Sequence, residues 1–129
     1  MSWYFDSSAI LKLILREKNY QSLAPYLNGD LYTSRLSRVE VFRTLAKREV
    51  GLNLQAERVF ERYNLVEIKN SILRKAETFP STISLASLDS IHVATALGIA
   101  PLIEGVITYD KNMVTNSEKL GLAAISPGE

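Results

Sequence analysis

Short strand-like runs alternate with longer helical segments along the whole chain, and this alternation constrains the fold more than any other feature. Aromatic and β-branched residues, which favour strands, gather at residues 3–5, 31–33, 65–68, 105–109 and 122–125. Apolar residues at helical spacing predict helices over residues 7–16, 19–27, 36–50, 54–63, 71–79, 88–98 and 111–120. Strands that alternate with helices are typical of an α/β domain built around a mainly parallel sheet.

No internal repeat, linker or change in composition divides the chain, so we expect one domain over residues 1–129. Ser7 or Ser8 can cap the first predicted helix, and Ser87 can cap the helix over residues 88–98. The N-terminal segment has no basic stretch before its apolar residues, and the apolar run 91–103 is too short to span a bilayer. We therefore expect neither a signal peptide nor a membrane span, and a cytoplasmic location.

The residue types that are missing exclude several kinds of site. The chain contains no cysteine, which excludes disulfides, thiolate catalysis and cysteine zinc sites. His92 is the only histidine, so sites that need two histidines are excluded as well. The net charge of +1 is too small for a chain that coats nucleic acid unspecifically, although it leaves room for a local basic patch.

Two of the four aspartates follow predicted strands directly. Asp6 comes after the strand over residues 3–5, and Asp110 comes after the strand over residues 105–109. Parallel α/β sheets bind their ligands outside the carboxyl ends of the strands. Asp6 and Asp110 therefore stand where such a sheet builds a site.

Two further acids lie within predicted helices. Asp89 belongs to a helix that is apolar nearly all round, which indicates burial, and an ionised carboxylate there needs a cation or donors. Glu40 lies just beyond the edge of the apolar arc of the helix over residues 36–50, with Arg43 and Lys47 on the same side.

If these four acids converge, they form a site for a hard cation. Two carboxylates about 5 Å apart repel each other by about 3 kcal/mol at an effective dielectric constant near 20. Four together need a divalent cation or shifted pKa values. Ligands that are all oxygen favour Mg²⁺ or Mn²⁺, and such a site can activate water and hold a phosphodiester.

A purely structural interpretation stays open beside this one. Asp6, Asp89 and Asp110 all stand near predicted helix starts, where aspartate is a favoured capping residue. Glu40 can instead pair with Arg43 or Lys47 as a solvated helix residue. Spacing alone does not decide between the two interpretations.

The whole chain resembles a PIN domain, and in particular the VapC-type toxins of prokaryotic toxin–antitoxin pairs. The resemblance is carried, in order, by YFDSSAILKL, SRVEVFRTL, LASLDSIHVATAL, VITYDKNM and LGLAAISP. The third segment is the most specific, because it holds an aspartate with His92 three residues later. Each segment alone is a weak signal, whereas the four acid-bearing segments in the right order at the right separations are a strong one.

The resemblance implies a three-layer α/β/α sandwich with a mainly parallel central sheet, and an Mg²⁺- or Mn²⁺-dependent endoribonuclease whose RNA substrate we expect to be tRNA or rRNA. It implies that the acidic, metal-binding and catalytic residues are Asp6, Glu40, Asp89 and Asp110. Ser7 and Thr108 stand at supporting positions beside the first and last acids, and for His92 we favour a hydrogen-bonded packing role. The resemblance also implies a homodimer and a separate VapB-type antitoxin that blocks the acidic groove.

Basic residues surround Glu40 in the sequence. Residues 35–49 contain five Lys or Arg and only two Glu, a surplus of +3 within a chain of net charge +1. Arg38, Arg43 and Lys47 are therefore candidates for contacts with RNA phosphates. Two other functions stay open beside the nuclease: a non-catalytic PIN-fold module that binds RNA or acts as a scaffold, and a phospho-acceptor signalling domain. The signalling domain is disfavoured because Asp6 is followed by two serines rather than a second acid.

Overall fold

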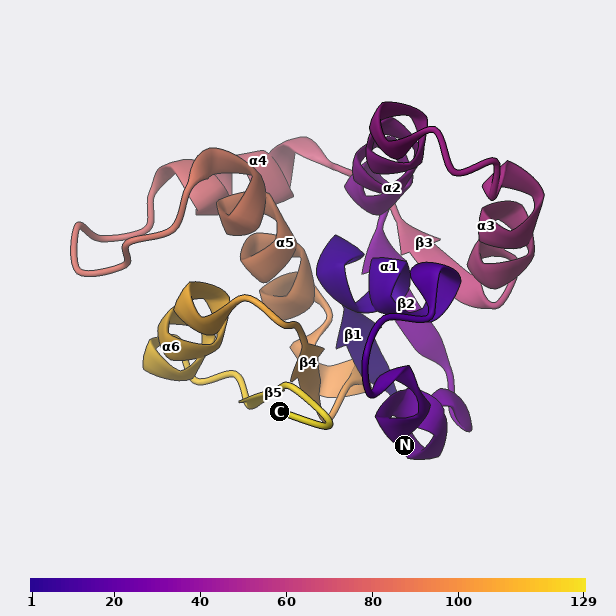
Figure 1. The fold of residues 1–129 in the computed structure, drawn as a ribbon. Helices are drawn as coiled ribbons and strands as arrows, with labels where there is room; N and C mark the ends of the chain where they lie inside the picture. Colours follow the sequence, from indigo (N-terminus) through magenta and orange to yellow (C-terminus); the bar gives the residue numbers. More distant parts are fainter.

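The computed structural model describes all residues from Met1 to Glu129 and contains one five-stranded sheet with helices on both sides (Figure 1). The strands are β1 (Trp3–Phe5), β2 (Leu31–Ser34), β3 (Tyr63–Val66), β4 (Gly105–Ile107) and β5 (Ala124–Ile125). The α-helices are α1 (Ser7–Leu15), α2 (Leu36–Arg48), α3 (Asn53–Phe60), α4 (Asn70–Glu77), α5 (Ser87–Gly98) and α6 (Lys111–Lys119). Two 3₁₀-helices, η1 (Tyr20–Leu27) and η2 (Ala100–Leu102), complete the elements.

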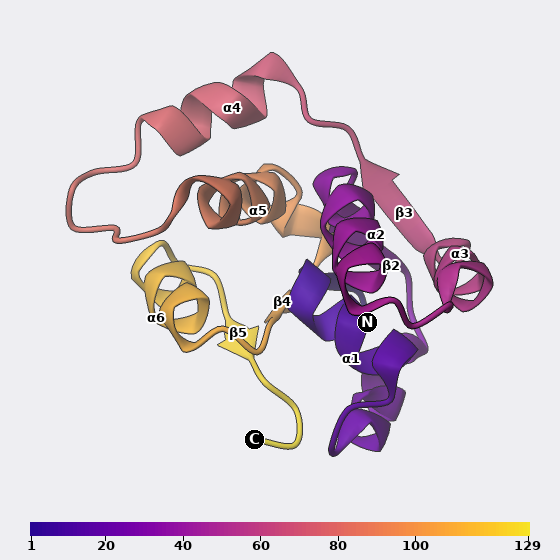
Figure 2. The ribbon, with the colours of Figure 1, turned by 45° about the horizontal axis from the view of Figure 1, so that its top comes forward.

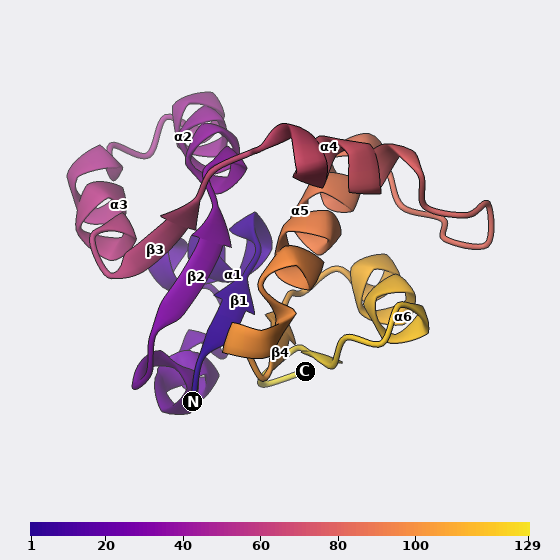
Figure 3. The ribbon, with the colours of Figure 1, turned by 180° about the vertical axis from the view of Figure 1, so that it is seen from behind.

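The strands lie in the order β3-β2-β1-β4-β5, and every neighbouring pair is parallel. In Figure 3, β1 lies between β2 and β4, in agreement with this order. The chain builds outward from β1 to β3 in one direction and then returns to add β4 and β5 on the other side of β1. The strand order therefore reverses between β1 and β4, and this reversal point is where open α/β sheets bind ligands.

Alternation along the strands divides the core into two layers. Phe5 and Ile107 pack on one face of the sheet with buried residues of α1, α2 and α3. Tyr4 and Val106 point to the other face, where they pack with residues of α5 and α6. Helix α4 lies outside α5, away from the strands (Figure 2). This arrangement confirms the expected three-layer α/β/α sandwich.

The predicted elements are all present, with local differences that have physical causes. The third strand begins at Tyr63 rather than at residue 65. The backbone of Tyr63 pairs with Leu31 in the sheet, and its buried ring packs against Phe5 and Phe60. The segment over residues 20–27 is a 3₁₀-helix, and it contains Pro25, which cannot donate an α-helical hydrogen bond.

The helix caps also differ from the expected ones. Asp6, not Ser7 or Ser8, caps α1, and α5 starts after Ala86 without a side-chain cap. None of the helices combines the length and the apolar character needed to cross a lipid bilayer.

Candidate active site

The carboxyl ends of β1 and β4 bring two distant segments together at the reversal point of the sheet. Phe5 pairs with Ile107, and the backbone N–H of Asp6 donates to the carbonyl oxygen of Ile107 at 3.2 Å. Asp6 and Thr108 thus follow their strands at the same level of the sheet. The expected position of Asp6 and Asp110 beyond strand ends agrees with this geometry.

Asp6 is a buried carboxylate, with only 3% of its surface exposed. The hydroxyl of Ser8 donates to Oδ1 at 2.6 Å, and the backbone N–H of Ala9 donates to the same oxygen at 3.0 Å. The hydroxyl of Thr108 donates to Oδ2 at 2.6 Å. Three donors therefore orient this carboxylate, and one of them is the N–H by which Asp6 caps α1.

Burial determines the acidity of Asp6. Desolvation raises the pKa of its carboxyl above the ordinary value of 3.8, although His92 and the donors Ser8, Thr108 and Ala9 act in the opposite direction. An ionised carboxylate that is buried in this way is energetically unfavourable unless a positive charge lies near it. The site would therefore gain stability from a bound cation.

Asp110 lies at the start of α6, joined to Asp6 through Thr108. Its backbone N–H donates to the Thr108 hydroxyl at 3.1 Å. The Thr108 hydroxyl therefore bonds both to the side chain of Asp6 and to the backbone of Asp110. Oδ1 of Asp110 accepts from the backbone N–H groups of Asn112 at 2.8 Å and Met113 at 3.2 Å. Asp110 is thus a helix cap, as the structural interpretation expected, and its Oδ2 is left without a hydrogen bond.

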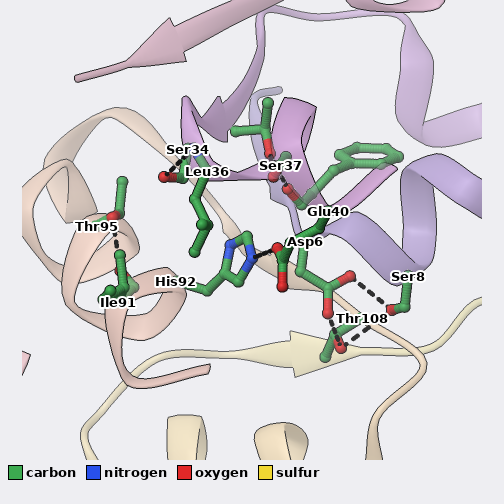
Figure 4. Close-up of polar contacts among 12 residues, drawn as sticks. Asp6, Ser8, Ser34, Leu36, Ser37, Glu40, Ile91, His92, Thr95 and Thr108 are labelled. Atoms are coloured by element: carbon green, nitrogen blue, oxygen red, sulfur yellow. Dashed lines mark hydrogen bonds and ion pairs between the residues drawn. The ribbon is translucent and has the colours of Figure 1, made fainter. Parts of the chain in front are cut away.

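Glu40 reaches the site from α2. Its Oε1 lies 2.5 Å from Nε2 of His92, and no ion pair joins it to Arg43 or Lys47. Figure 4 shows the Glu40–His92 contact beside Asp6 and its partners. Oε2 of Glu40 has no hydrogen-bond partner, so one oxygen of this carboxylate is also free.

Asp89 lies in the first turn of α5, half-buried, and accepts no hydrogen bond. Burial has the largest effect on its carboxyl and raises its pKa above the ordinary value of 3.8. The negative charges of Asp110, Asp6 and Glu40 raise this pKa further, whereas His92 acts in the opposite direction. Asp110, Asp6 and Glu40 therefore lie near enough to Asp89 to affect its pKa, although the four acids come from four separate parts of the chain.

The donors of this site suit a hard divalent cation, but they are not arranged as a complete ligand sphere. No three acidic or histidine side chains lie close enough together to hold a metal ion. The oxygens without hydrogen bonds are both those of Asp89, Oε2 of Glu40 and Oδ2 of Asp110. All are carboxylate oxygens, the ligand type that Mg²⁺ and Mn²⁺ prefer.

Of the two predicted supporting residues, one contacts Asp6 and the other does not. The hydroxyl that contacts Asp6 belongs to Ser8, and the side chain of Ser7 makes no hydrogen bond. Thr108 does contact Asp6, at the predicted supporting position.

The three basic candidates on α2 separate into two kinds. Arg38 donates to both carboxylate oxygens of Glu57, at 2.6 and 2.9 Å, and stacks on the rings of Phe42 and Phe60. Its guanidinium thus joins α2 to α3. Arg43 and Lys47 are exposed and form no ion pair.

Sequence reasoning missed two side chains of the site. Ser8 is predicted only as a possible cap, whereas its hydroxyl donates to Asp6. Tyr4 is predicted only as part of a strand, whereas its hydroxyl lies 2.6 Å from Nδ1 of His92. The alternation of β1 was a usable signal, because Tyr4 must point to the face opposite Phe5, where α5 lies. His92 is buried and hydrogen-bonded as expected, but its partner is Glu40 of the site.

Comparison with known proteins gives one consistent result. A family model for the PIN domain matches residues 3–118. Ribonuclease VapC47 of Mycobacterium tuberculosis is 31% identical over 97% of this chain and 96% of its own length. Ribonuclease VapC35 of the same species is 35% identical, over 98% of this chain and 97% of its own length.

Solved structures support the same fold. A toxin–antitoxin complex from Klebsiella pneumoniae contains a chain that matches with a TM-score of 0.76 at 17% identity, over 98% of both chains. VapC20 of Mycobacterium tuberculosis, described as a toxin that cleaves the sarcin–ricin loop, matches with a TM-score of 0.72 at 12% identity, over 97% of this chain and 99% of its own.

The fold and the acidic site together define a class of α/β proteins that gather carboxylates at the reversal point of a parallel sheet. This chain belongs to the PIN domain family and, within it, to the group of its VapC relatives.

Proposed function

We propose that this protein is a metal-dependent endoribonuclease toxin that cleaves RNA phosphodiester bonds and is inhibited by a cognate antitoxin. The observation that carries the proposal is the gathering of carboxylates at the ends of β1 and β4: Thr108 hydrogen-bonds to Asp6 and to the backbone of Asp110. Asp110, Asp6 and Glu40 also raise the pKa of Asp89, in addition to burial. Carboxylates held this close without a cation repel one another, and a divalent ion relieves the repulsion. The relatives named ribonucleases support the chemistry.

In this proposal Asp6 and Asp89 hold Mg²⁺ or Mn²⁺, with Glu40 and Asp110 completing the acidic set. When bound, the cation supplies Lewis acidity toward a phosphodiester oxygen and lowers the pKa of water. Ser8 and Thr108 keep Asp6 in one orientation by donating to its two oxygens. A carboxylate held in this way loses no further side-chain freedom when substrate binds.

The proposed partners follow from the basic residues and from the relatives. Arg43 and Lys47 are exposed on the helix that carries Glu40, where they can bind the phosphates that the carboxylates repel. Structural neighbours include VapBC2 from Rickettsia felis and VapBC-1 from Haemophilus influenzae, which supports a VapB-type antitoxin. We further propose a homodimer that acts in the cytoplasm on tRNA or rRNA.

One observation favours a second candidate, a PIN-fold module that binds RNA without cleaving it. No three ligating side chains are close enough to hold a metal in this structure. Such a module would bind RNA with the same basic residues and would not respond to Mg²⁺ or EDTA. A phospho-acceptor role has no support, because no second acid adjoins Asp6 and β3 is followed by no aspartate.

The test is RNA cleavage by the purified protein, the Asp6→Asn variant and the Asp89→Asn variant. Asp30 provides a matched control, because it is an exposed aspartate before β2 and outside the acidic site. We expect Mg²⁺-dependent cleavage that EDTA abolishes, that both site variants lose, and that Asp30→Asn retains. Binding of RNA without metal-dependent cleavage in any variant would favour the second candidate.

A further inference from the structure

A chain of buried hydrogen bonds ends at Glu40. The backbone N–H of Ser34 donates to the hydroxyl oxygen of Tyr4 at 3.2 Å. That hydroxyl lies 2.6 Å from Nδ1 of His92, and Nε2 of His92 lies 2.5 Å from Oε1 of Glu40. This series of hydrogen bonds joins four elements, β2, β1, α5 and α2. Its first three residues, Ser34, Tyr4 and His92, are at most 1% exposed.

The direction of these hydrogen bonds follows from the donors present. The structure gives the Tyr4 oxygen two partners, and the Ser34 amide can only donate. Since Tyr4 is fully buried, its own hydrogen needs an acceptor, and Nδ1 of His92, 2.6 Å away, can accept it. With Nδ1 accepting from Tyr4, the ring hydrogen of His92 is on Nε2, from which it is donated to Glu40. The tautomer of the histidine is thus set through Tyr4 by a backbone amide two hydrogen bonds away.

A hydrogen bond from Nε2 of His92 has a specific effect on Glu40. It holds one carboxylate oxygen, Oε1, in place. The other oxygen, Oε2, has no hydrogen bond and remains available to the acidic site. Glu40 is a flexible side chain on an otherwise partly exposed helix surface, and no other side chain hydrogen-bonds to its carboxylate.

We propose that His92 is the positioning residue for Glu40, and that Tyr4 selects the tautomer in which His92 does this. The proposal rests on the proposed function, because Glu40 acts in the acidic site only if that site does chemistry. It goes beyond a packing role for His92, which would require only the shape of the ring. Partners of this kind around metal-binding carboxylates and histidines typically change metal affinity or activity 10- to 100-fold.

The tautomer can be measured directly, because His92 is the only histidine in the chain. Nitrogen-15 spectra of the imidazole of the full-length protein near neutral pH report which nitrogen carries the hydrogen. We expect a protonated Nε2 and a bare Nδ1 in the wild type, and a loss of this preference in Tyr4→Phe. A hydrogen on Nδ1 in the wild type, alone or together with one on Nε2, would overturn the tautomer assignment, whether or not the protein cleaves RNA.

The positioning role is tested with two variants of His92 at constant RNA substrate and Mg²⁺. His92→Leu keeps volume but removes both nitrogens, whereas His92→Gln can return an N–H donor near the position of Nε2. We expect kcat to fall about 100-fold in His92→Leu with KM changed less than about 3-fold, and His92→Gln to recover about 10-fold. Mn²⁺ affinity, measured without RNA, should fall about 10-fold in His92→Leu.

Two comparisons separate positioning from packing. Thr95→Val is the matched control, because Thr95 is fully buried on α5 one turn after His92 and hydrogen-bonds only to its own helix. It should leave kcat and Mn²⁺ affinity unchanged. In a Glu40→Gln background, His92→Leu should cause no further loss, since both changes remove the same interaction. Additive losses, or no rescue by His92→Gln, would show that His92 only packs, while inactivity of the wild type itself would contradict the proposed function instead.

Discussion

The hydroxyl of Thr108 lies 2.6 Å from Oδ2 of Asp6, although the two residues are 102 positions apart in the sequence. The contact exists because β1 and β4 are neighbours in the sheet, with Phe5 paired to Ile107. The same hydroxyl accepts the backbone N–H of Asp110. One threonine thus joins the two strand ends that supply the first and last acids of the site.

Loss of this hydroxyl should destabilise the protein and weaken the site. Thr108→Val keeps the shape but leaves the buried Asp6 carboxylate with one donor fewer, which costs about 1.5–3 kcal/mol for a hydrogen bond to a charged group. Urea unfolding measures the change. Thr108→Ser, which keeps the hydroxyl, should retain most of the stability, and equal stability of Thr108→Val and wild type would disprove the role of this contact.

The metal-free protein should lose stability as the pH rises above about 4. Burial and the neighbouring acids raise the pKa of Asp89 above its ordinary value of 3.8, so the folded state binds more protons than the unfolded state between these two pKa values. Stability therefore falls across that window as pH rises, and Asp6 contributes with the same sign. Asp89→Asn should have a shallower pH dependence in EDTA, measured by the free energy of unfolding. If the free energy of unfolding depended on pH in the same way in the wild type and in Asp89→Asn, a raised pKa of Asp89 would be disproved.

Divalent cations should stabilise the folded protein. A cation that binds only the native state adds about 2.7 kcal/mol at one hundred times its Kd. We expect Mg²⁺ or Mn²⁺ to raise the melting temperature of the wild type and of Asp30→Asn, but not of Asp6→Asn or Asp89→Asn. An equal shift in all four proteins would mean that the ions bind elsewhere.

The basic residues of α2 should separate in a salt titration of RNA binding. Arg43→Glu and Lys47→Glu should each weaken binding and reduce the slope of log K against log salt by about one contact. Arg38→Met should mainly lower the melting temperature, since Arg38 bridges to Glu57 and stacks on two phenylalanines. Arg58→Glu on α3 is the surface control. Unchanged slopes for Arg43 and Lys47 would remove them from the RNA interface.

The protein should be a homodimer in solution. Light scattering at micromolar concentration should give about twice the chain mass of 14.4 kDa. A monomer mass at that concentration would contradict the prediction.

The fold could be predicted from the sequence because its signals are local. The short aromatic strand over residues 3–5 and the helices with regularly spaced apolar residues specify their own conformation, and alternation of strands and helices selects a parallel sheet. The positions of Asp6 and Asp110 then follow from a general rule for such sheets. The bounds of β3 were missed because the buried position of Tyr63 depends on Phe5 and Leu31, which are distant in sequence.

The rest of the site could not be derived from spacing. Glu40 and Asp89 lie inside helices, and whether they face the strand ends depends on how α2 and α5 pack on opposite faces of the sheet. The pairing of Glu40 with His92, rather than with the nearby Arg43 or Lys47, is likewise a tertiary contact across 52 residues. The resemblance to a known family supplied these two acids, and the structure supplied their partners.

The most direct test is the position of manganese in crystals soaked in MnCl₂, located by its anomalous scattering. We predict a peak within ligating distance of carboxylate oxygens of both Asp6 and Asp89. A manganese peak that contacts neither carboxylate would contradict the acidic site and the nuclease function proposed from it. The absence of any peak at saturating Mn²⁺, with the two carboxylates far apart, would contradict them as well.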